Sequence, residues 1–422
     1  MALSELGDFN RGKSKHRPRN DPKLFQNGIY PFIQTGDIKE ANLYLDCHTE
    51  NYNEFGLKQS KLWKENTLCI TIAANIAETA LLKYPMCFPD SVVGFTAYEG
   101  VSSELFMHYI FTFIKKSIQS AASGSIQDNI NIDFLTKLKF RIPSKIEQDK
   151  IAAVLSALDK KIALNKQINA RLEEMAKTLY DYWFVQFDFP DANGKPYKSS
   201  GGEMVFDETL KREIPKGWEV KSLGEVVTHS TTGLNPRDNF SLGNGENFYV
   251  TIKNIKDNEI KFHTCAKITD EALNVINKRS KLDKGDILFT SIEPIGSTYL
   301  LHEKPKNWDI NESVFSIRSK SDFITPYFLF MLLSSDEIKS FTRQVSTGSV
   351  HKGIRHESLK RFTFAYSGID LIKNFTNLIS PMQQNIFFLQ KQNHHLTQLR
   401  DFLLPMLMNG QVSVTCRGAR DG

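Results

Sequence analysis

Residues 142–184 constrain the fold more than any other stretch, because their side chains repeat in alternating steps of four and three. This spacing keeps the repeating side chains on one face of a helix and is typical of a coiled coil. Ser144 and Glu147 have the spacing of a capping box, and the next Pro or Gly is Pro190. We predict a helix from Ser144 to Trp183, roughly 60 Å long at about 1.5 Å per residue, whose apolar face needs a packing partner. The repeating positions are Ile151, Leu155, Leu158, Ile162, Asn165, Asn169, Leu172, Ala176, Leu179 and Trp183.

Residues 369–404 show the same rhythm and are the predicted partner. The two repeats superimpose when 224 is added to the first, because 386 − 162 = 224, and Asn169 then falls on Asn393. A polar Asn on such a face costs stability and can fix the register of the helices, whereas an Asn beside solvent has no such role. Pro381 predicts a kink or a restart of the second helix. The repeating positions are Ile372, Phe375, Ile379, Met382, Ile386, Leu389, Asn393, Leu396, Arg400 and Leu403.

The rest of the chain also repeats at half its length. Short segments recur in the same order, at an offset that grows from 217 to 224 as small loop insertions would make it. We infer a duplication, in which each half is a globular domain followed by a long helix. Two such units predict a pseudo-two-fold arrangement with antiparallel helices. The matching segments are 6–8 with 223–225, 31–39 with 248–256, 60–68 with 280–288, and 124–140 with 348–364.

The globular halves mix both types of secondary structure. Segments 248–255, 285–292 and 313–319 are rich in β-branched and aromatic residues, which favours strands. Segments 105–120 and 324–344 predict helices. Because strands and helices do not alternate regularly, we predict an α+β fold with two globular domains separated by two long antiparallel coiled-coil helices.

The composition is that of a globular chain with more than one core. The chain has 422 residues, a net charge of +5 and a pI near 8.7, which permits a polyanionic partner without requiring one. Its five Cys residues have no metal-ligand spacing, and we expect reduced thiols in the cytoplasm. We find no signal segment and no apolar run long enough for a membrane span, so no membrane role is expected. We expect residues 415–422 to form a loose tail outside the fold.

A nucleotide-binding enzyme is one alternative, because Gly7 to Ser14 satisfies the pattern G-x-x-x-x-G-K-S. A phosphate-binding loop of this kind needs a buried strand before it and a helix after it. Only six residues precede Gly7, Pro18 and Pro22 follow the motif, and the matching part of the second half lacks Gly-Lys-Ser. A coiled-coil adaptor without a nucleic-acid partner is a further alternative.

The basic residues that follow Gly7 favour contacts with phosphate, although a solvated surface loop would have the same composition. The matching segment of the second half carries hydroxyl, amide and guanidinium groups that can read base edges. A second basic cluster follows Gly348, and polar residues occupy its place in the first half. Different polar residues on a shared apolar frame would suit two different DNA half-sites, and ordinary loop drift would look the same. The candidates are Arg11, Lys13, Lys15, Arg17 and Arg19; Thr231, Thr232, Asn235 and Arg237; Ser349, His351, Lys352 and Arg355; and Ser125 and Gln127.

Catalytic motifs are missing from the sequence. The segment Asn235-Pro236-Arg237-Asp238 lacks the second Pro and the aromatic residue of an adenine methyltransferase motif. No H-E-x-x-H motif is present, and we interpret His394-His395 as a solvent-facing pair. We therefore predict no catalytic residue, no metal and no cofactor.

Four longer segments resemble one protein family. They read LYDYWFVQFDF from Leu179, GKPYKSSGGEMV from Gly194, EIPKGWEVKSLGEV from Glu213 and LTQLRDFLLPMLMNGQV from Leu396. Together with the domain–helix–domain–helix order, they resemble the DNA specificity subunit of type I restriction-modification systems. The resemblance spans Leu6 to Val414, although the first half lacks the Trp-Glu-Val lead-in that opens the second half.

This resemblance implies two target recognition domains, at 1–141 and 216–365, that each read half of a bipartite double-stranded DNA sequence. It implies spacer helices at 142–188 and 366–414, joined to the second domain by a linker at 189–215. The implied partners are two methyltransferase subunits and the restriction subunits, which translocate and cleave DNA, while the specificity subunit itself is not an enzyme. Further expected DNA contacts lie beside the matched strands, at Gln34, Thr35, Thr251, Lys253 and Asn254.

Overall fold

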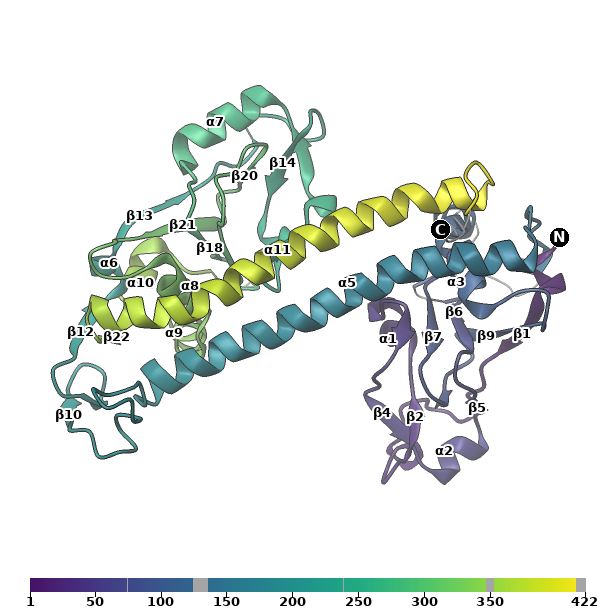
Figure 1. The fold of residues 1–422 in the computed structure, drawn as a ribbon, viewed down its shortest axis with the longest axis horizontal. Helices are drawn as coiled ribbons and strands as arrows, with labels where there is room; N and C mark the ends of the chain where they lie inside the picture. The colour runs from purple at the N-terminus through teal and green to yellow at the C-terminus, as the bar shows by residue number, and fades with distance from the viewer. Residues whose placement is uncertain (74, 124–135, 238, 347–352, 415–422) are drawn as a thin grey trace, which may run out of the picture. The chain divides into compact units, whose positions relative to one another are not determined.

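The computed structural model describes residues 1–73, 75–123, 136–237, 239–346 and 353–414. The chain forms two compact units (Figure 1). The first unit contains Met1–Lys166 and Lys391–Gly422, and the second unit contains Gln167–Gln390. Helix α5 (Lys145–Tyr180) leads from the first unit into the second, and helix α11 (Ile369–Met408) leads back.

In the described residues, the globular part of the first unit holds two sheets with helices packed beside them. Helix α3 packs against the larger sheet, where Leu68–Thr71 is a fully buried strand. The larger sheet has the order β1 (Gly7–Arg11), β9 (Val92–Ala97), β6 (Leu68–Thr71), β7 (Thr79–Leu82) and β3 (Tyr44–Leu45). The smaller sheet has the order β4 (Glu50–Tyr52), β2 (Tyr30–Phe32), β8 (Met86–Cys87) and β5 (Leu62–Trp63). The helices are α1 (Thr35–Glu40), α2 (Glu54–Lys58) and α3 (Glu104–Ser123).

The globular part of the second unit is built from short sheets and five helices. Its four-stranded sheet has the order β13 (Val227–Thr232), β21 (Val314–Ser319), β18 (Ile287–Thr290) and β19 (Thr298–Leu300). Its three-stranded sheet has the order β17 (Ala266–Ile268), β14 (Asn247–Val250) and β20 (Trp308–Ile310). Three two-stranded pairs are β10 (Met204–Asp207) with β11 (Arg212–Pro215), β12 (Glu219–Ser222) with β22 (Thr363–Tyr366), and β15 (Ile255–Lys256) with β16 (Glu259–Ile260). The helices are α6 (Leu223–Val226), α7 (Asp270–Ser280), α8 (Pro326–Ser334), α9 (Asp336–Val345) and α10 (His356–Lys360).

The strand order confirms the internal duplication. The order β1-β9-β6-β7 in the first unit matches β13-β21-β18-β19 in the second, and all of these pairs are antiparallel. The order β4-β2-β8 matches β17-β14-β20, with one antiparallel and one parallel pair in each. The turn after the central strand also repeats: the Thr71 hydroxyl donates to the Asn75 carbonyl, and the Thr290 hydroxyl donates to the Pro294 carbonyl. The mixed sheets and helices confirm the α+β class.

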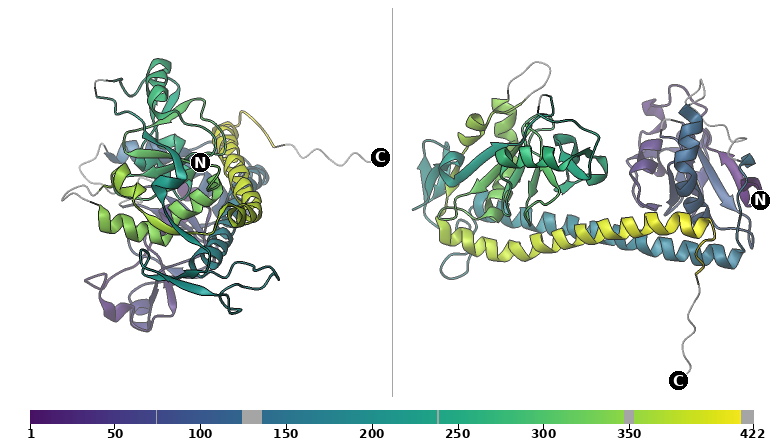
Figure 2. Two further views of the ribbon diagram at one scale, coloured as in Figure 1. Left: turned by 90° about the vertical axis from the view of Figure 1, so that its left-hand side faces the viewer. Right: turned by 90° about the horizontal axis from the view of Figure 1, so that it is seen from above.

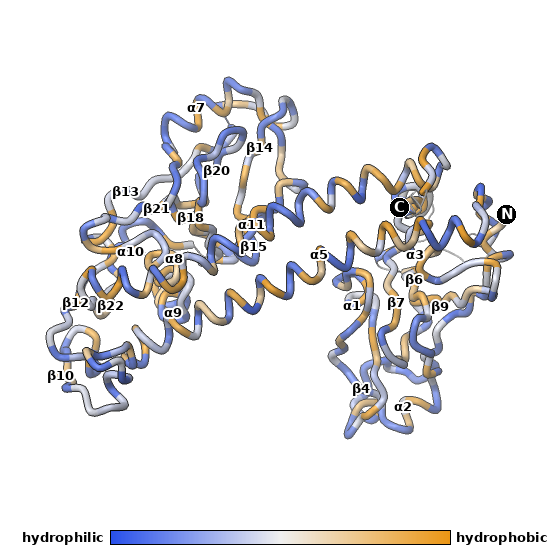
Figure 3. The backbone as a smooth tube through the Cα atoms, in the orientation of Figure 1, coloured by the Kyte–Doolittle hydropathy of each residue, from blue (hydrophilic) through white to orange (hydrophobic). Residues whose placement is uncertain are grey.

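The two predicted long helices are present and pack against each other within each unit. In the first unit, Leu155 on α5 belongs to the same core as Leu404 and Leu407 on α11. In the second unit, Trp183 packs against Phe375, with ring centroids 5.8 Å apart. Later residues on α5 therefore meet earlier residues on α11, so the helices are antiparallel, and they lie side by side in the view from above (Figure 2). Apolar and polar stretches alternate along both helices (Figure 3), as their spacing predicts.

The ends of α5 follow the capping prediction at one end only. The Ser144 backbone N–H donates to Glu147 at 3.2 Å, and the Glu147 N–H donates to the Ser144 hydroxyl at 3.4 Å, which makes the predicted capping box. The α-helix ends three residues before the predicted Trp183, and a π-helical turn follows over Asp181–Val185. This turn positions Trp183 and Phe184, which are both buried.

Three further expectations need correction. Pro381 does not restart the second helix, because it lies on the exposed side of α11, where water can hydrate the carbonyl of exposed Asn377. The helix predicted over 324–344 is two helices, because Ser335 ends α8 and its hydroxyl accepts from the N–H of Ile338 to cap α9. The strand predicted over 248–255 ends at Val250 and a short 3₁₀ turn follows.

The helix pairing favours the first of the two roles expected for the Asn residues, which is to fix the register of the helices. Asn165 is fully buried in the first unit, and its side-chain amide donates to Gln392 at 2.7 Å and to Asn393 at 2.8 Å. Asn169 is only 9% exposed, so it does not lie beside solvent. The superposition of Asn169 on Asn393 marks equivalence between the two halves, whereas the contact of Asn393 is with Asn165. This polar contact across the helices can fix their register.

Candidate nucleic-acid interface

The basic loop of the first unit leaves the sheet at the end of β1. The strand Gly7–Arg11 pairs with β9, so most of the proposed nucleotide-binding motif is itself a strand. Gly12 allows the chain to turn away, because a Cβ there would lie 2.2 Å from the Pro89 carbonyl oxygen. The Gln59 side-chain oxygen then accepts from the backbone N–H of Lys15 at 2.6 Å. The loop is therefore anchored by its backbone, while the side chains of Lys13 and Lys15 stay exposed.

Three of the predicted arginines converge on a single aspartate. The Arg11 Nε donates to the Asp90 backbone carbonyl at 2.5 Å. The guanidinium nitrogens of Arg17 and Arg19 lie 3.5 Å and 2.6 Å from the Asp90 carboxylate. One carboxylate holds these side chains in place without cancelling their charge, and both guanidinium groups are about half exposed. The loop thus presents a positively charged surface that can neutralise phosphates.

Some of the residues predicted beside the matched strands form hydrogen bonds within the domain, and others are exposed. Gln34 and Thr251 both stand immediately before a helical turn, as expected for equivalent residues. The Gln34 amide donates to Glu50 at 2.8 Å, and Thr35 begins α1. Asn254 is 4% exposed, and its side chain forms hydrogen bonds within the domain: it accepts from Thr251 at 2.8 Å and donates to Thr264 at 2.9 Å. The neighbouring Lys253 is exposed.

Several candidates of the second unit meet at one surface. The Ser230 hydroxyl on β13 hydrogen-bonds the ring of His356 at the start of α10. Arg355, which precedes His356, is exposed, and Thr231, which follows Ser230, is half-buried. The predicted contact Thr232 is buried, because successive side chains of a strand point to opposite faces of the sheet.

The structure adds Arg279, which sequence reasoning missed. Its Nη2 donates to the Thr232 hydroxyl at 3.2 Å, and its backbone carbonyl accepts from the Thr231 hydroxyl at 3.2 Å. Arg279 lies in the last turn of α7, next to Lys278. The only sequence signal was this pair of basic residues at a helix end, which normally indicates capping.

The charge of this surface comes from its arginines. Burial lowers the pKa of His356 to about 4, so its ring is neutral near pH 7. The Asn235 side chain donates no hydrogen bond to the described residues of this surface. Its backbone carbonyl accepts from the Asn239 side chain at 3.0 Å. Arg237 is exposed. The predicted contacts Ser125, Gln127, Ser349, His351 and Lys352 lie outside the described residues.

The exposed groups of the described chain are of the kinds that contact nucleic acid. Within it, no group of three or more His, Cys, Asp or Glu side chains is placed to hold a metal ion. None of its helices combines the length and apolar character needed to cross a bilayer. Exposed cations beside hydroxyl and amide groups match the two kinds of contact that proteins make with DNA, to phosphates and to base edges.

Comparisons with known proteins identify the family of the chain. Residues 1–174 and 215–366 match the model of the type I restriction modification DNA specificity domain. The chain is 24% identical to the type I restriction enzyme MjaIX specificity subunit of Methanocaldococcus jannaschii, over 98% of this chain and 93% of that protein. It is also 24% identical to the HindI specificity subunit of Haemophilus influenzae, over 96% of this chain and 98% of that protein.

A solved structure has the same fold. It is the S subunit of a type I restriction-modification system from M. genitalium, with a TM-score of 0.61 and 15% sequence identity. The alignment covers 97% of this chain and 95% of that one. The likeness therefore extends over both units and both long helices.

Proposed function

This chain belongs to the type I restriction-modification DNA specificity family, and we propose that it reads a bipartite double-stranded DNA target and carries the other subunits of the complex. The observation that carries the proposal is the repeated strand order, β1-β9-β6-β7 and β13-β21-β18-β19. One fold that occurs twice offers two equivalent reading surfaces. We assign the two readers to residues 1–141 and 216–365.

The two surfaces support different half-sites because their polar groups differ. In the first unit the loop at 11–19 is dominated by cations, so its contribution is phosphate neutralisation that fades as salt rises. In the second unit exposed Arg279 contacts the hydroxyls of half-buried Thr231 and buried Thr232, so a cation lies beside the Thr231 hydroxyl, which is the one of the two that can reach a base edge.

Recruitment of partner subunits is supported by apolar side chains that the helix pair leaves exposed. In the first unit Leu399 and Phe402 of α11 are 45% and 63% exposed. In the second unit Phe388 of α11 is 63% exposed and Met175 of α5 is 54% exposed. Aromatic and Met side chains of this kind are enriched in protein interfaces. We assign these faces to two methyltransferase subunits and, through the complex, to the restriction subunits.

In this proposal the chain is a non-catalytic subunit that works in the cytoplasm. The nucleotide-binding alternative is disfavoured because Gly7 opens strand β1, whereas a phosphate-binding loop follows a strand and precedes a helix. An adaptor without DNA contact is disfavoured by the family match to a DNA specificity domain.

The experiment is selection of binding sites from random duplexes by the full chain in complex with its methyltransferase subunit. The wild-type complex is expected to select two short half-sites with a constant gap. Arg279→Ala is expected to relax one half-site by about 1–3 kcal/mol and leave the other unchanged, because its contacts lie in the second unit only. Lys13→Ala with Lys15→Ala is expected to weaken binding to all sequences and to reduce the salt slope by about two.

Exposed Lys211→Ala is the matched control, because its ammonium lies in the β10–β11 turn, where it pairs with Glu208 at 2.6 Å. It is expected to leave both half-sites and the salt slope unchanged. A single undivided site, or equal loss at both half-sites in Arg279→Ala, would contradict the assignment.

A further inference from the structure

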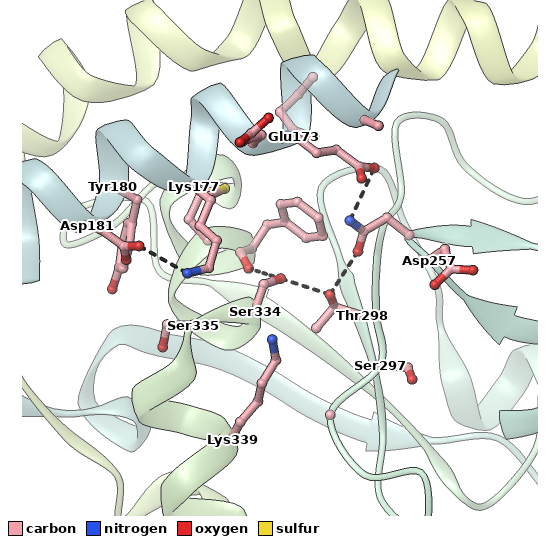
Figure 4. Close-up of a pocket in the computed structure, with 17 residues that line it drawn as sticks. Glu173, Lys177, Tyr180, Asp181, Asp257, Ser297, Thr298, Ser334, Ser335 and Lys339 are labelled. Carbon is pink, nitrogen blue, oxygen red and sulfur yellow. Dashed lines mark hydrogen bonds and ion pairs between the residues drawn. The ribbon is translucent and has the colours of Figure 1, made fainter. Parts of the chain in front are cut away.

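A polar cavity of about 520 Å³ lies within the second unit (Figure 4). Helix α5 contributes Glu173, Lys177 and Tyr180 to its wall, and α11 contributes Gln383. The turns before β16 and β19 and the junction of α8 with α9 complete it. The volume is in the range of small-ligand pockets, about 300–1,000 Å³. Nothing in the DNA-reading role uses this cavity.

Two polar groups of the wall face the cavity without a hydrogen bond to the described part of the chain. They are the amide of Gln383 and the hydroxyl of Tyr180, which belong to residues that are 5% and 3% exposed. Because both residues line the cavity, a bound molecule can supply hydrogen-bond partners to them.

The duplicated first unit shows what fills the equivalent place. Gln383 corresponds to Asp159, since 383 − 159 = 224, and Ala176 corresponds to Arg400, since 400 − 176 = 224. In the first unit the Arg400 Nη1 donates to Asp159 at 2.8 Å, and the Tyr109 hydroxyl donates to the other carboxylate oxygen at 2.7 Å.

The cavities differ accordingly in size. Beside Arg400 and Asp159 the space that remains is about 140 Å³, compared with about 520 Å³ in the second unit. The first unit therefore fills this place with a guanidinium of its own chain. The second unit has no guanidinium at the equivalent position, because Ala176 is a small side chain buried in the core.

The charges of the second cavity favour a cation. The Lys177 ammonium is already held by Asp181 at 3.1 Å (Figure 4) and by Asp336 at 3.0 Å. The Glu173 carboxylate accepts only a neutral hydrogen bond, from the Asn258 side chain at 3.3 Å. Burial raises the pKa of the Glu173 carboxyl, because no cation among the described residues compensates its charge. A bound cation would provide that compensation.

We propose that this cavity binds a guanidinium group supplied by another molecule, with Glu173 as its counter-ion and Gln383 and Tyr180 as hydrogen-bond partners. A guanidinium has five N–H donors in one plane, which suit a carboxylate, an amide oxygen and a hydroxyl together. The group can come from an arginine of an assembling protein subunit, a source that rests on the proposed function, or from a free guanidinium compound.

The test is calorimetric titration of the full chain with agmatine, a small molecule that carries a guanidinium. Agmatine is expected to bind, whereas N-(4-aminobutyl)urea, which keeps the ammonium of agmatine but has a neutral urea in place of the guanidinium, is not. Glu173→Gln is expected to weaken agmatine binding about tenfold or more. Gln383→Leu is expected to weaken it as well, without a change of charge. Glu208→Gln is the matched control, because this carboxylate is 80% exposed in the β10–β11 turn.

The source of the group is decided by the affinity of the methyltransferase subunit for the same variants. If Glu173→Gln weakens that association about tenfold and agmatine competes with it, the guanidinium is an arginine of the partner. If agmatine binds but the association is unchanged, the ligand is a free compound. Absence of agmatine binding, or binding that Glu173→Gln leaves unchanged, would overturn the proposal. DNA-site selection is unaffected by that result, so the proposed function stands or falls separately.

Discussion

Removal of the Arg400 guanidinium should destabilise the first unit through the carboxylate it leaves behind. The Asp159 side chain is 10% exposed and the Arg400 side chain is 27% exposed, so their ion pair is largely shielded from water. Breaking a buried pair by removing one partner costs about 3–5 kcal/mol. We expect Arg400→Met to lower the free energy of unfolding by about 3 kcal/mol, the lower end of this range, because the Tyr109 hydroxyl still donates to Asp159.

The assay is thermal unfolding of the full chain, with hydrogen exchange on α3 and α5 to locate the change. In a unit of about 150–250 residues, 3 kcal/mol corresponds to a loss of about 6–12 °C in Tm. The protection of backbone amides from hydrogen exchange should fall in α3, which carries Tyr109. In the second unit this protection should stay unchanged. The double variant Asp159→Asn with Arg400→Met should recover most of the loss, because no charge is then left buried.

Two outcomes would refute this reasoning. A loss below about 1 kcal/mol in Arg400→Met would show that water solvates the Asp159 carboxylate. A double variant no more stable than Arg400→Met would show that the loss comes from packing of the arginine stem and not from the unpaired charge.

Two pH-dependent predictions and one on the helix pair follow from other buried groups. Burial raises the pKa of Asp309 to about 7, so the folded state should lose stability as pH rises from about 4 to about 7. Above pH 7, Asp309→Asn should therefore increase the free energy of unfolding, measured in urea, by up to about 4 kcal/mol. Burial lowers the pKa of His108 to about 4, so stability should fall by up to about 3 kcal/mol as pH drops from about 6.5 to 4, and His108→Phe should flatten that slope. Asn165→Leu should raise Tm but loosen the register of the helices, visible as a second set of inter-helix distances by spin labelling. Flat pH profiles in the wild-type chain, or a single distance set in Asn165→Leu, would contradict these expectations.

Sequence reasoning succeeded where a pattern has a physical period. The apolar face of each long helix, which includes Leu155 on the first and Phe375 on the second, was predictable, because spacing alone determines which face of a helix is apolar. The duplication was predictable from weak matches, and strand order then confirmed it. The capping box at Ser144 was predictable, since it depends on two residues three positions apart.

The parts that sequence reasoning missed depend on three-dimensional neighbours. The contact of Asn165 with Asn393 could not be derived from the superposition of the two halves, which relates equivalent residues and not partners. Arg279 carries no motif, and its place beside Thr232 results from the packing of α7 against β13. The effect of Pro381 depends on which side of α11 faces water, and that was not decided by the spacing.

The most direct measurement is the methylome of a host without its own adenine methylation that expresses this chain with its methyltransferase subunit. The account predicts methylated adenines in one bipartite motif with a constant gap. Exchange of residues 216–365 for those of a relative with different specificity should change one half of the motif and keep the other half and the gap. Methylation at an undivided motif, or a change in both halves after that exchange, would contradict the central claim that the two repeated domains each read one half-site.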